Sequence, residues 1–257
     1  NWMNLNGLWE YAIVATNASA PTNWQGEILV PFPVESALSG VKKPLTAQQA
    51  LWYRRMFSAG DLSAGHRLLL HFGAVDWEAV VWVNGIRVGM HRGGYAGFSF
   101  DITEHLKPGV ENELVVRVWD PTGTDGSARG KQKLESMAKP EGYWYTPCSG
   151  IWQTAWLEPV PANHISALRV TPDLDAASLL IKAEVAGAPN GAEVIVIARD
   201  AQGREAGRAK GSLGSTLAVR LAEPHPWSPD DPHLYDLAVT LSVGGKTVDE
   251  VRSYAGL

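Results

Sequence analysis

Residues 79–88 read AVVWVNGIRV, and this stretch indicates the local fold more directly than any other. Two runs rich in β-branched and aromatic residues flank the dipeptide Asn84-Gly85. Asn-Gly favours a type I′ turn, because both central positions of that turn need a positive φ, and such turns join the strands of tight hairpins. The stretch therefore predicts a β-hairpin that turns at Asn84-Gly85.

The same two-residue period continues along the chain, as expected for strands with one packed face and one wetter face. It is clearest at residues 114–118 (LVVRV), 179–185 (LLIKAEV) and 237–243 (LAVTLSV). Gly244-Gly245 and residues 200–203 (DAQG) are turn signals between such runs. We therefore expect an all-β chain that forms sandwiches or open barrels.

Helical periodicity is short wherever it occurs, and we expect helices only at residues 45–50 and 103–106. Residues 120–142 interrupt the strand pattern with a polar, glycine-rich loop, whose length is typical of a functional or disordered segment. Pro159-Val160-Pro161 stiffens the backbone. We place a domain boundary there, which gives domains at residues 1–160 and 161–257.

The composition argues against several classes of partner and binding site. The 257 residues carry a formal net charge of −5, which argues against a nucleic-acid partner. No apolar run approaches the roughly 20 residues that span a bilayer, so no membrane partner is expected. Cys148 is the one cysteine, which excludes an intrachain disulfide and a cysteine-based zinc site. The seven histidines lack metal-ligand spacing, so neither a metal nor a cofactor is expected.

Candidate catalytic groups are few. Ser149 does not lie in the G-x-S-x-G motif of a nucleophile elbow. Asp76 and Glu78 are two residues apart on one strand face, so they cannot lie on opposite sides of a glycosidic bond. We expect them to pair with cations such as Arg54 or Arg55. Loop aspartates leave a calcium site open as an alternative, and they are Asp101, Asp120 and Asp125.

Longer, aromatic-rich strings carry more specific information. They are 51–55 (LWYRR), 71–79 (HFGAVDWEA), 81–85 (VWVNG), 91–95 (HRGGY), 98–103 (FSFDIT), 129–132 (RGKQ), 144–147 (WYTP), 149–154 (SGIWQT), 226–229 (PWSP), 232–235 (PHLY) and 253–254 (SY). In this order they resemble glycoside hydrolase family 2, which contains β-galactosidases, β-glucuronidases and β-mannosidases. The chain departs from the family at Gly97, where proline is frequent, and at Ala255, where an aromatic residue is usual.

The resemblance implies a galactose-binding-like jelly-roll sandwich up to residue 160 and an immunoglobulin-like β-sandwich from residue 161 onward. It also implies a retaining β-glycosidase, whose catalytic glutamates lie on a (β/α)₈ barrel of the same polypeptide. Such a barrel needs about 250 residues of alternating strands and helices, and the chain shows no such alternation. We therefore expect an N-terminal fragment that contains no catalytic residue and is inactive alone.

In this family, loops of the jelly roll help to shape substrate recognition at the mouth of the barrel. The resemblance therefore implies that the matching residues bind carbohydrate, and these are Arg129, Lys131, Gln132, Tyr143, Trp144 and Tyr145. Flat rings stack on sugar faces, and cationic side chains donate hydrogen bonds to hydroxyls or to a uronate. The alternative is that Trp144 and Tyr145 pack in an interface between domains.

Two other functions stay open, because a jelly roll alone does not decide function. One is a stand-alone, lectin-like carbohydrate-binding protein, and the other is a structural module that mediates homo-oligomer contacts. The resemblance does not identify the sugar or the linkage of a β-glycoside substrate, since enzymes of different specificity share these motifs. By analogy with the family, we expect a periplasmic or secreted location rather than a cytoplasmic one.

Overall fold

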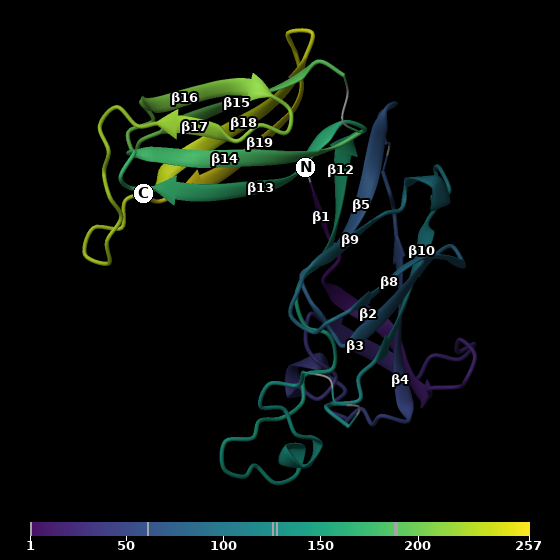
Figure 1. Cartoon of the computed structure of the whole chain (residues 1–257). Coiled ribbons are helices and arrows are strands. Elements are labelled where there is room, and N and C mark those ends of the chain that lie inside the picture. The colour runs from purple at the N-terminus through teal and green to yellow at the C-terminus, as the bar shows by residue number, and fades with distance from the viewer. Residues whose placement is uncertain (1, 61, 125, 127, 188–189) are drawn as a thin grey trace. The chain divides into compact units, whose positions relative to one another are not determined.

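The computed structural model describes residues 2–60, 62–124, 126, 128–187 and 190–257. The chain divides into two compact units, unit 1 (Asn1–Pro159) and unit 2 (Val160–Leu257), which can be followed by colour in Figure 1. In the described part of the structure, strands account for 51% and helices for 4%, which confirms the all-β fold class. Among the described residues, no helix is long and apolar enough to cross a membrane.

Unit 1 contains two main sheets. Within the described part of the chain, one sheet has the strand order β1-β12-β5-β9 and the other has the order β3-β2-β4-β10-β7-β8, while β6 pairs separately with β11. The strands are β1 (Met3–Asn4), β2 (Gly7–Ala15), β3 (Gly26–Val30), β4 (Gln49–Phe57), β5 (His66–Phe72), β6 (Val75–Asp76), β7 (Glu78–Val83), β8 (Ile86–Arg92), β9 (Phe98–Asp101), β10 (Asn112–Trp119), β11 (Gly150–Ile151) and β12 (Ala155–Pro161). Short 3₁₀ helices are η1 (Ala37–Ser39), η2 (Thr103–His105) and η3 (Leu134–Met137).

Alternate residues of the two sheets meet in one apolar core. Trp9 and Tyr53 are among its largest side chains, and their rings meet edge to face with centroids 6.2 Å apart. Burial of an aromatic side chain of this size stabilises the folded state by at most roughly 5 kcal/mol. The Trp9 indole also donates a hydrogen bond to the carbonyl of Leu5 (2.8 Å), so its burial leaves the N–H satisfied.

The predicted hairpin is confirmed as β7 and β8. Asn84 and Gly85 have φ angles of 50° and 80°, as a type I′ turn requires. The Asn84 side chain secures the turn, because its Nδ2 donates to Asn112 Oδ1 (2.7 Å) and its Oδ1 accepts from the backbone N–H of Glu113 (3.0 Å). The other period-two runs lie in β10 and in two strands of unit 2.

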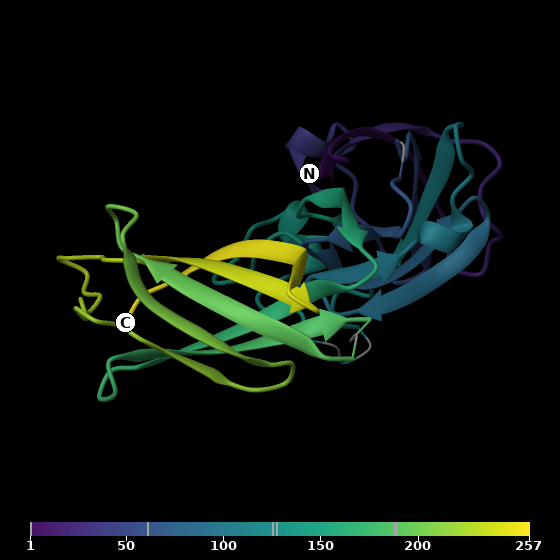
Figure 2. The same cartoon turned by 90° about the horizontal axis from the view of Figure 1, so that it is seen from above.

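Unit 2 is a second sandwich, whose described residues form the sheets β13-β14-β17 and β16-β15-β18-β19. In Figure 2, β18 and β19 are yellow and β13 and β14 are green. The strands are β13 (His164–Asp173), β14 (Ser178–Ala186), β15 (Ala192–Arg199), β16 (Glu205–Ser212), β17 (Leu217–Arg220), β18 (Tyr235–Val243) and β19 (Lys246–Ala255). Its core is aliphatic apart from Tyr235.

The helix expected at residues 45–50 is wrong. Gln49 and Ala50 begin β4 and pair with β2 at Ala15 and Val14, so sheet pairing overrides the local helical preference. The short helix expected at residues 103–106 is confirmed as η2. The helices η1 and η3 were not expected from the sequence, since a single 3₁₀ turn is too short to show a periodic pattern.

Candidate functional site

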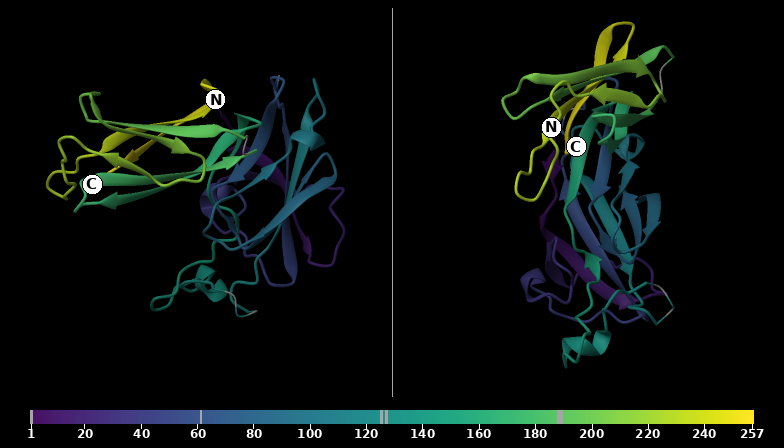
Figure 3. Two further views of the ribbon diagram at one scale, coloured as in Figure 1. Left: turned by 45° about the horizontal axis from the view of Figure 1, so that its top comes forward. Right: turned by 60° about the vertical axis from the view of Figure 1, so that its left-hand side comes forward.

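The predicted carbohydrate-binding residues lie in the long segment between β10 and β11. Figure 3 shows this segment and η3 projecting beyond the strands of unit 1. Backbone hydrogen bonds join its two halves, from Lys133 N to Tyr145 O (2.9 Å) and from Tyr145 N to Lys131 O (2.8 Å). Gln132 and Tyr145 accordingly form a parallel β-bridge. The segment therefore has internal structure of its own.

Three of the predicted residues, Arg129, Tyr143 and Trp144, contact one another, and a fourth, Tyr145, follows them in the sequence with an exposed ring. The guanidinium carbon of Arg129 lies 4.6 Å from the centre of the Trp144 ring, which is a cation–π contact. The ring of Tyr143 lies 4.8 Å from that of Trp144, centroid to centroid. Tyr143 is 62% exposed and Tyr145 is 65% exposed, so both rings are open to solvent. We call Arg129, Tyr143, Trp144 and Tyr145 the rim; Lys131 is exposed beside it.

Gln132 has a different environment from the rest of the predicted set. It is buried, and its Nε2 donates a hydrogen bond to Asp76 Oδ2 (2.9 Å). Its Oε1 accepts a hydrogen bond from the backbone N–H of Cys148 (2.6 Å). Both polar atoms of the side chain are therefore engaged inside unit 1. Gln132 therefore connects Asp76 of β6 with Cys148, which lies near the end of the segment between β10 and β11, here called the rim segment.

Three buried carboxyl groups lie near Gln132, and they are Glu35, Asp76 and Asp120. Burial raises the pKa of Asp76 to about 7, although the hydrogen bond from Gln132 opposes the shift. Burial also raises the pKa of Glu35, against a hydrogen bond from the backbone N–H of Ser149 (2.9 Å). The Ser149 hydroxyl donates to Asp120 Oδ2 (2.6 Å), so this serine supports the loop.

Glu78 pairs with cations as expected, although these are Arg92 and Arg117 and not Arg54 or Arg55. For Asp76 the expected pairing with a cation is wrong. Glu78 pairs with Arg92 (2.9 Å), because the register of β7 and β8 places these two residues opposite each other. Asp76 faces inward and binds Gln132 instead. Arg54 pairs with Glu10 (2.6 Å) across β2 and β4.

The loop aspartates do not assemble into a metal site in the described part of the structure, where no group of three potential ligands occurs. Asp101 binds Arg67 (2.8 Å) and the hydroxyl of Thr103 (2.6 Å). Asp125 lies outside the described residues. Burial raises the pKa of the Cys148 thiol to about 12, so at neutral pH this group is a protonated thiol and a poor nucleophile.

A hollow of about 270 Å³ adjoins the rim. It is lined by residues 45–48, by residues 121–124 and by η3, with Arg129 on one side. The sequence contains no signal for this hollow, because its walls come from segments about 75 residues apart that only the folded sheet brings together. The hollow meets the rim at Arg129, which is among its lining residues.

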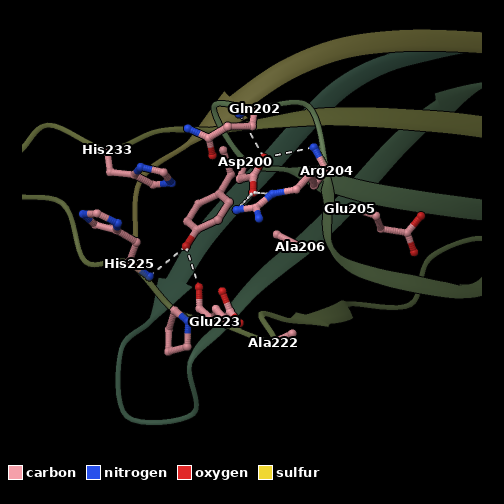
Figure 4. Close-up of a pocket in the computed structure, with 11 residues that line it drawn as sticks. Asp200, Gln202, Arg204, Glu205, Ala206, Ala222, Glu223, His225 and His233 are labelled. Atoms are coloured by element: carbon pink, nitrogen blue, oxygen red, sulfur yellow. Dashed lines mark hydrogen bonds and ion pairs between the residues drawn. The ribbon is translucent and has the colours of Figure 1, made fainter.

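A second hollow, of about 410 Å³, lies in unit 2 and is drawn in Figure 4. Its charged groups are largely paired with protein groups: Arg204 binds Asp200 (2.8 Å), and His225 binds Asp231 (2.6 Å). The His225 and His233 rings stack with centroids 4.2 Å apart. The Tyr235 hydroxyl accepts a hydrogen bond from the backbone N–H of His225 (2.8 Å). These contacts stabilise the loop before β18.

Family comparisons cover both units. Residues 2–153 match the family model described as "Glycosyl hydrolases family 2, sugar binding domain". Residues 163–257 match the model described as "Glycosyl hydrolases family 2". The first of these matches, which ends at residue 153, contains the whole rim segment.

Relatives and solved structures agree with these matches. A β-glucuronidase of Paenibacillus borealis is 28% identical, over 99% of this chain and 45% of its own length. A β-galactosidase of Thermoanaerobacter pseudethanolicus is 27% identical, over 80% of this chain and 28% of its own length. The solved β-glucuronidase of Lactobacillus rhamnosus has the same fold over the whole chain and 44% of its own length, with a TM-score of 0.77 and 24% identity. The chain thus spans less than half the length of these proteins.

Proposed function

Because the chain belongs to glycosyl hydrolase family 2, we propose that it is the N-terminal, non-catalytic region of a retaining β-glycosidase. The observation that carries this proposal is the tandem order of the two family matches, at residues 2–153 and 163–257. Relatives that match this region are β-glucuronidases and β-galactosidases of more than twice its length. In this proposal the catalytic glutamates lie on a (β/α)₈ barrel of the same polypeptide.

The rim and Lys131 are the groups that we propose to contact the β-glycoside. Tyrosine and tryptophan rings offer flat apolar faces to the C–H face of a pyranose, and Arg129 and Lys131 offer N–H donors to its oxygens. A retaining mechanism needs two carboxyl groups about 5–5.5 Å apart on either side of the scissile bond. Glu35 and Asp76 are buried and accept hydrogen bonds from the protein, which argues against that role.

The first test is the mass of the native polypeptide in its source cells, detected with an antibody raised against this chain. We expect a band above about 55 kDa, which leaves room for the two sandwiches and a barrel. A band near the 27.8 kDa of this chain would contradict the proposal. The purified chain should also fail to hydrolyse aryl β-glycosides, and turnover that scales with its concentration would contradict its non-catalytic role.

A stand-alone carbohydrate-binding protein is the second candidate function. The exposed rings of Tyr143 and Tyr145 favour it, because they belong to one unit and need no other domain to form a platform. Calorimetric titration with β-glycosides, together with the mass measurement above, separates the two candidates. Homo-oligomer formation remains a prediction, which light scattering at several protein concentrations tests.

We also propose that residues 1–160 and 161–257 are independent folding domains. Each contains its own apolar core, which supports the division. Separate expression of the two pieces tests it. Each piece should show a cooperative thermal transition, and failure of both pieces to fold would contradict the proposal.

A further inference from the structure

Tyr95 lies next to the rim although it is far from it in the sequence. It belongs to the loop between β8 and β9, which the sequence presents as a tight glycine-rich turn into a strand. Its hydroxyl oxygen lies 3.5 Å from Gln132 Nε2. A side chain at Gly130 would approach the same oxygen to 3.1 Å. Tyr95 and residues 130–132 of the rim segment are therefore direct neighbours.

The loop that carries Tyr95 is held in place by contacts with Trp152 and Asp76. The Trp152 indole donates a hydrogen bond to the carbonyl of Gly94 (2.8 Å), and the Tyr95 and Trp152 rings meet edge to face at 6.1 Å. Gly94 also lies so close to the Asp76 carboxylate that a Cβ at this position would collide with it. Asp76 therefore supports both the Tyr95 loop and, through Gln132, the rim segment.

Despite these contacts, Tyr95 is 61% exposed. A tyrosine that is held in place but left open presents a rigid ring and a polar tip, and it binds a ligand with little loss of conformational entropy. Sugar rings need both features, because each has an apolar C–H face and hydroxyls at its edge. We infer that Tyr95 is a carbohydrate-contacting residue, which extends the rim across the neighbouring loop. This inference rests on the proposed carbohydrate-binding role of the rim.

The test uses the 257-residue chain, with methyl β-D-glucuronide and methyl β-D-galactoside as probes in saturation-transfer NMR titrations. Tyr95→Ala should weaken binding of at least one probe roughly three- to tenfold, the range expected for one aromatic contact. Tyr95→Phe should weaken binding less, because it keeps the ring. Tyr254→Ala is the matched control, since Tyr254 is 68% exposed and lies in unit 2. It should leave binding unchanged.

Two further measurements separate the outcomes. The melting temperature should stay the same in Tyr95→Ala, because the exposed ring contributes little to the core; a fall that explains the loss of binding would overturn the inference. Trp144→Ala tests the rim itself. If Trp144→Ala weakens binding and Tyr95→Ala does not, Tyr95 is excluded while the rim stands. If neither variant changes binding, or if neither probe binds the chain, the role of Tyr95 and the rim's role in this chain both fail.

Discussion

Asp76 offers the sharpest test of how the rim is supported. Asp76 is 4% exposed, and its carboxyl group accepts a hydrogen bond from Gln132 while Gly94 packs against it. Burial raises its pKa from the ordinary 3.8 to about 7. Substitution of Asp76 by asparagine removes the titrating group but keeps an oxygen that can accept the Gln132 hydrogen bond. The variant therefore isolates the effect of ionisation from the effect of packing.

The direction in which stability changes with pH follows from the number of protons that Asp76 binds in the folded and unfolded states. Between pH 4 and pH 7 the folded protein keeps the Asp76 proton and the unfolded chain releases it, so stability falls as the pH rises. Each pH unit in this window changes the free energy of unfolding by about 1.4 kcal/mol. Over the roughly three units between the two pKa values, ionisation of Asp76 lowers stability by about 4 kcal/mol, as an upper figure. The full loss is present above pH 7.

The measurement is urea denaturation between pH 4 and pH 8, followed by tryptophan fluorescence. Ten of the eleven tryptophans precede residue 160, so this signal reports on unit 1. Asp76→Asn should match the native chain near pH 4 and exceed its stability by up to about 4 kcal/mol at pH 8. Glu35, whose pKa is also raised by burial, is present in both proteins, so its own titration contributes to both pH profiles.

Asp101→Asn is the control with the opposite sign. Burial acts to raise the pKa of Asp101, but hydrogen bonds from Thr103 and Arg67 outweigh it and lower the pKa. This variant should therefore be less stable than the native chain above pH 4, where the contribution of ionised Asp101 is fully present, and the difference should shrink as the pH falls below 4. Parallel pH profiles for the native chain and Asp76→Asn would refute the reasoning, because they would show that Asp76 titrates equally in the folded and unfolded states.

Three other substitutions test separate parts of the structure. Gly150→Ala should lower the free energy of unfolding of unit 1 by more than about 2 kcal/mol, because Gly150 has φ +96° and a Cβ would collide with the Tyr53 hydroxyl; the fluorescence denaturation curve measures this. Tyr235→Phe should destabilise unit 2 by about 1–2 kcal/mol, since the backbone N–H of His225 loses its acceptor; calorimetry of the chain would show an unchanged transition if this bond were unimportant. Trp144→Ala in the longer enzyme should raise KM or lower kcat with little change in melting temperature, and a large fall in melting temperature with unchanged kinetics would assign Trp144 to packing instead.

The local sequence pattern was sufficient to predict most of the strands and turns. Asn84-Gly85 and Gly244-Gly245 turn where their positive φ angles allow it, and the alternating runs are strands because one face of each meets a core. The pattern failed at residues 45–50, where pairing of Ala50 with Val14 decides the conformation. A contact across 36 residues of chain leaves no mark on the local sequence.

In the candidate site too, some features could be predicted from the sequence and others depend on contacts between distant residues. Arg129 and Trp144 were expected to act together from the family resemblance, and the structure brings the two side chains into contact. The burial of Gln132 could not be anticipated, because its partner Asp76 lies 56 residues earlier in the chain. Tyr95 was missed for a similar reason, since only the pairing of β7 with β8 and β10 brings its loop beside the rim segment.

The rigidity of the rim can be argued from its anchors. A loop of more than twenty residues with many glycines would lose most of its binding energy to ordering if it were free in solution. Here Gln132 connects the segment to Asp76 of β6 and to the backbone of Cys148 near the end of the segment. Backbone pairing between Lys131, Lys133 and Tyr145 closes the middle. These contacts order the part of the segment from residue 131 to residue 148 when unit 1 folds, so a sugar that meets the exposed rings there finds them already in place.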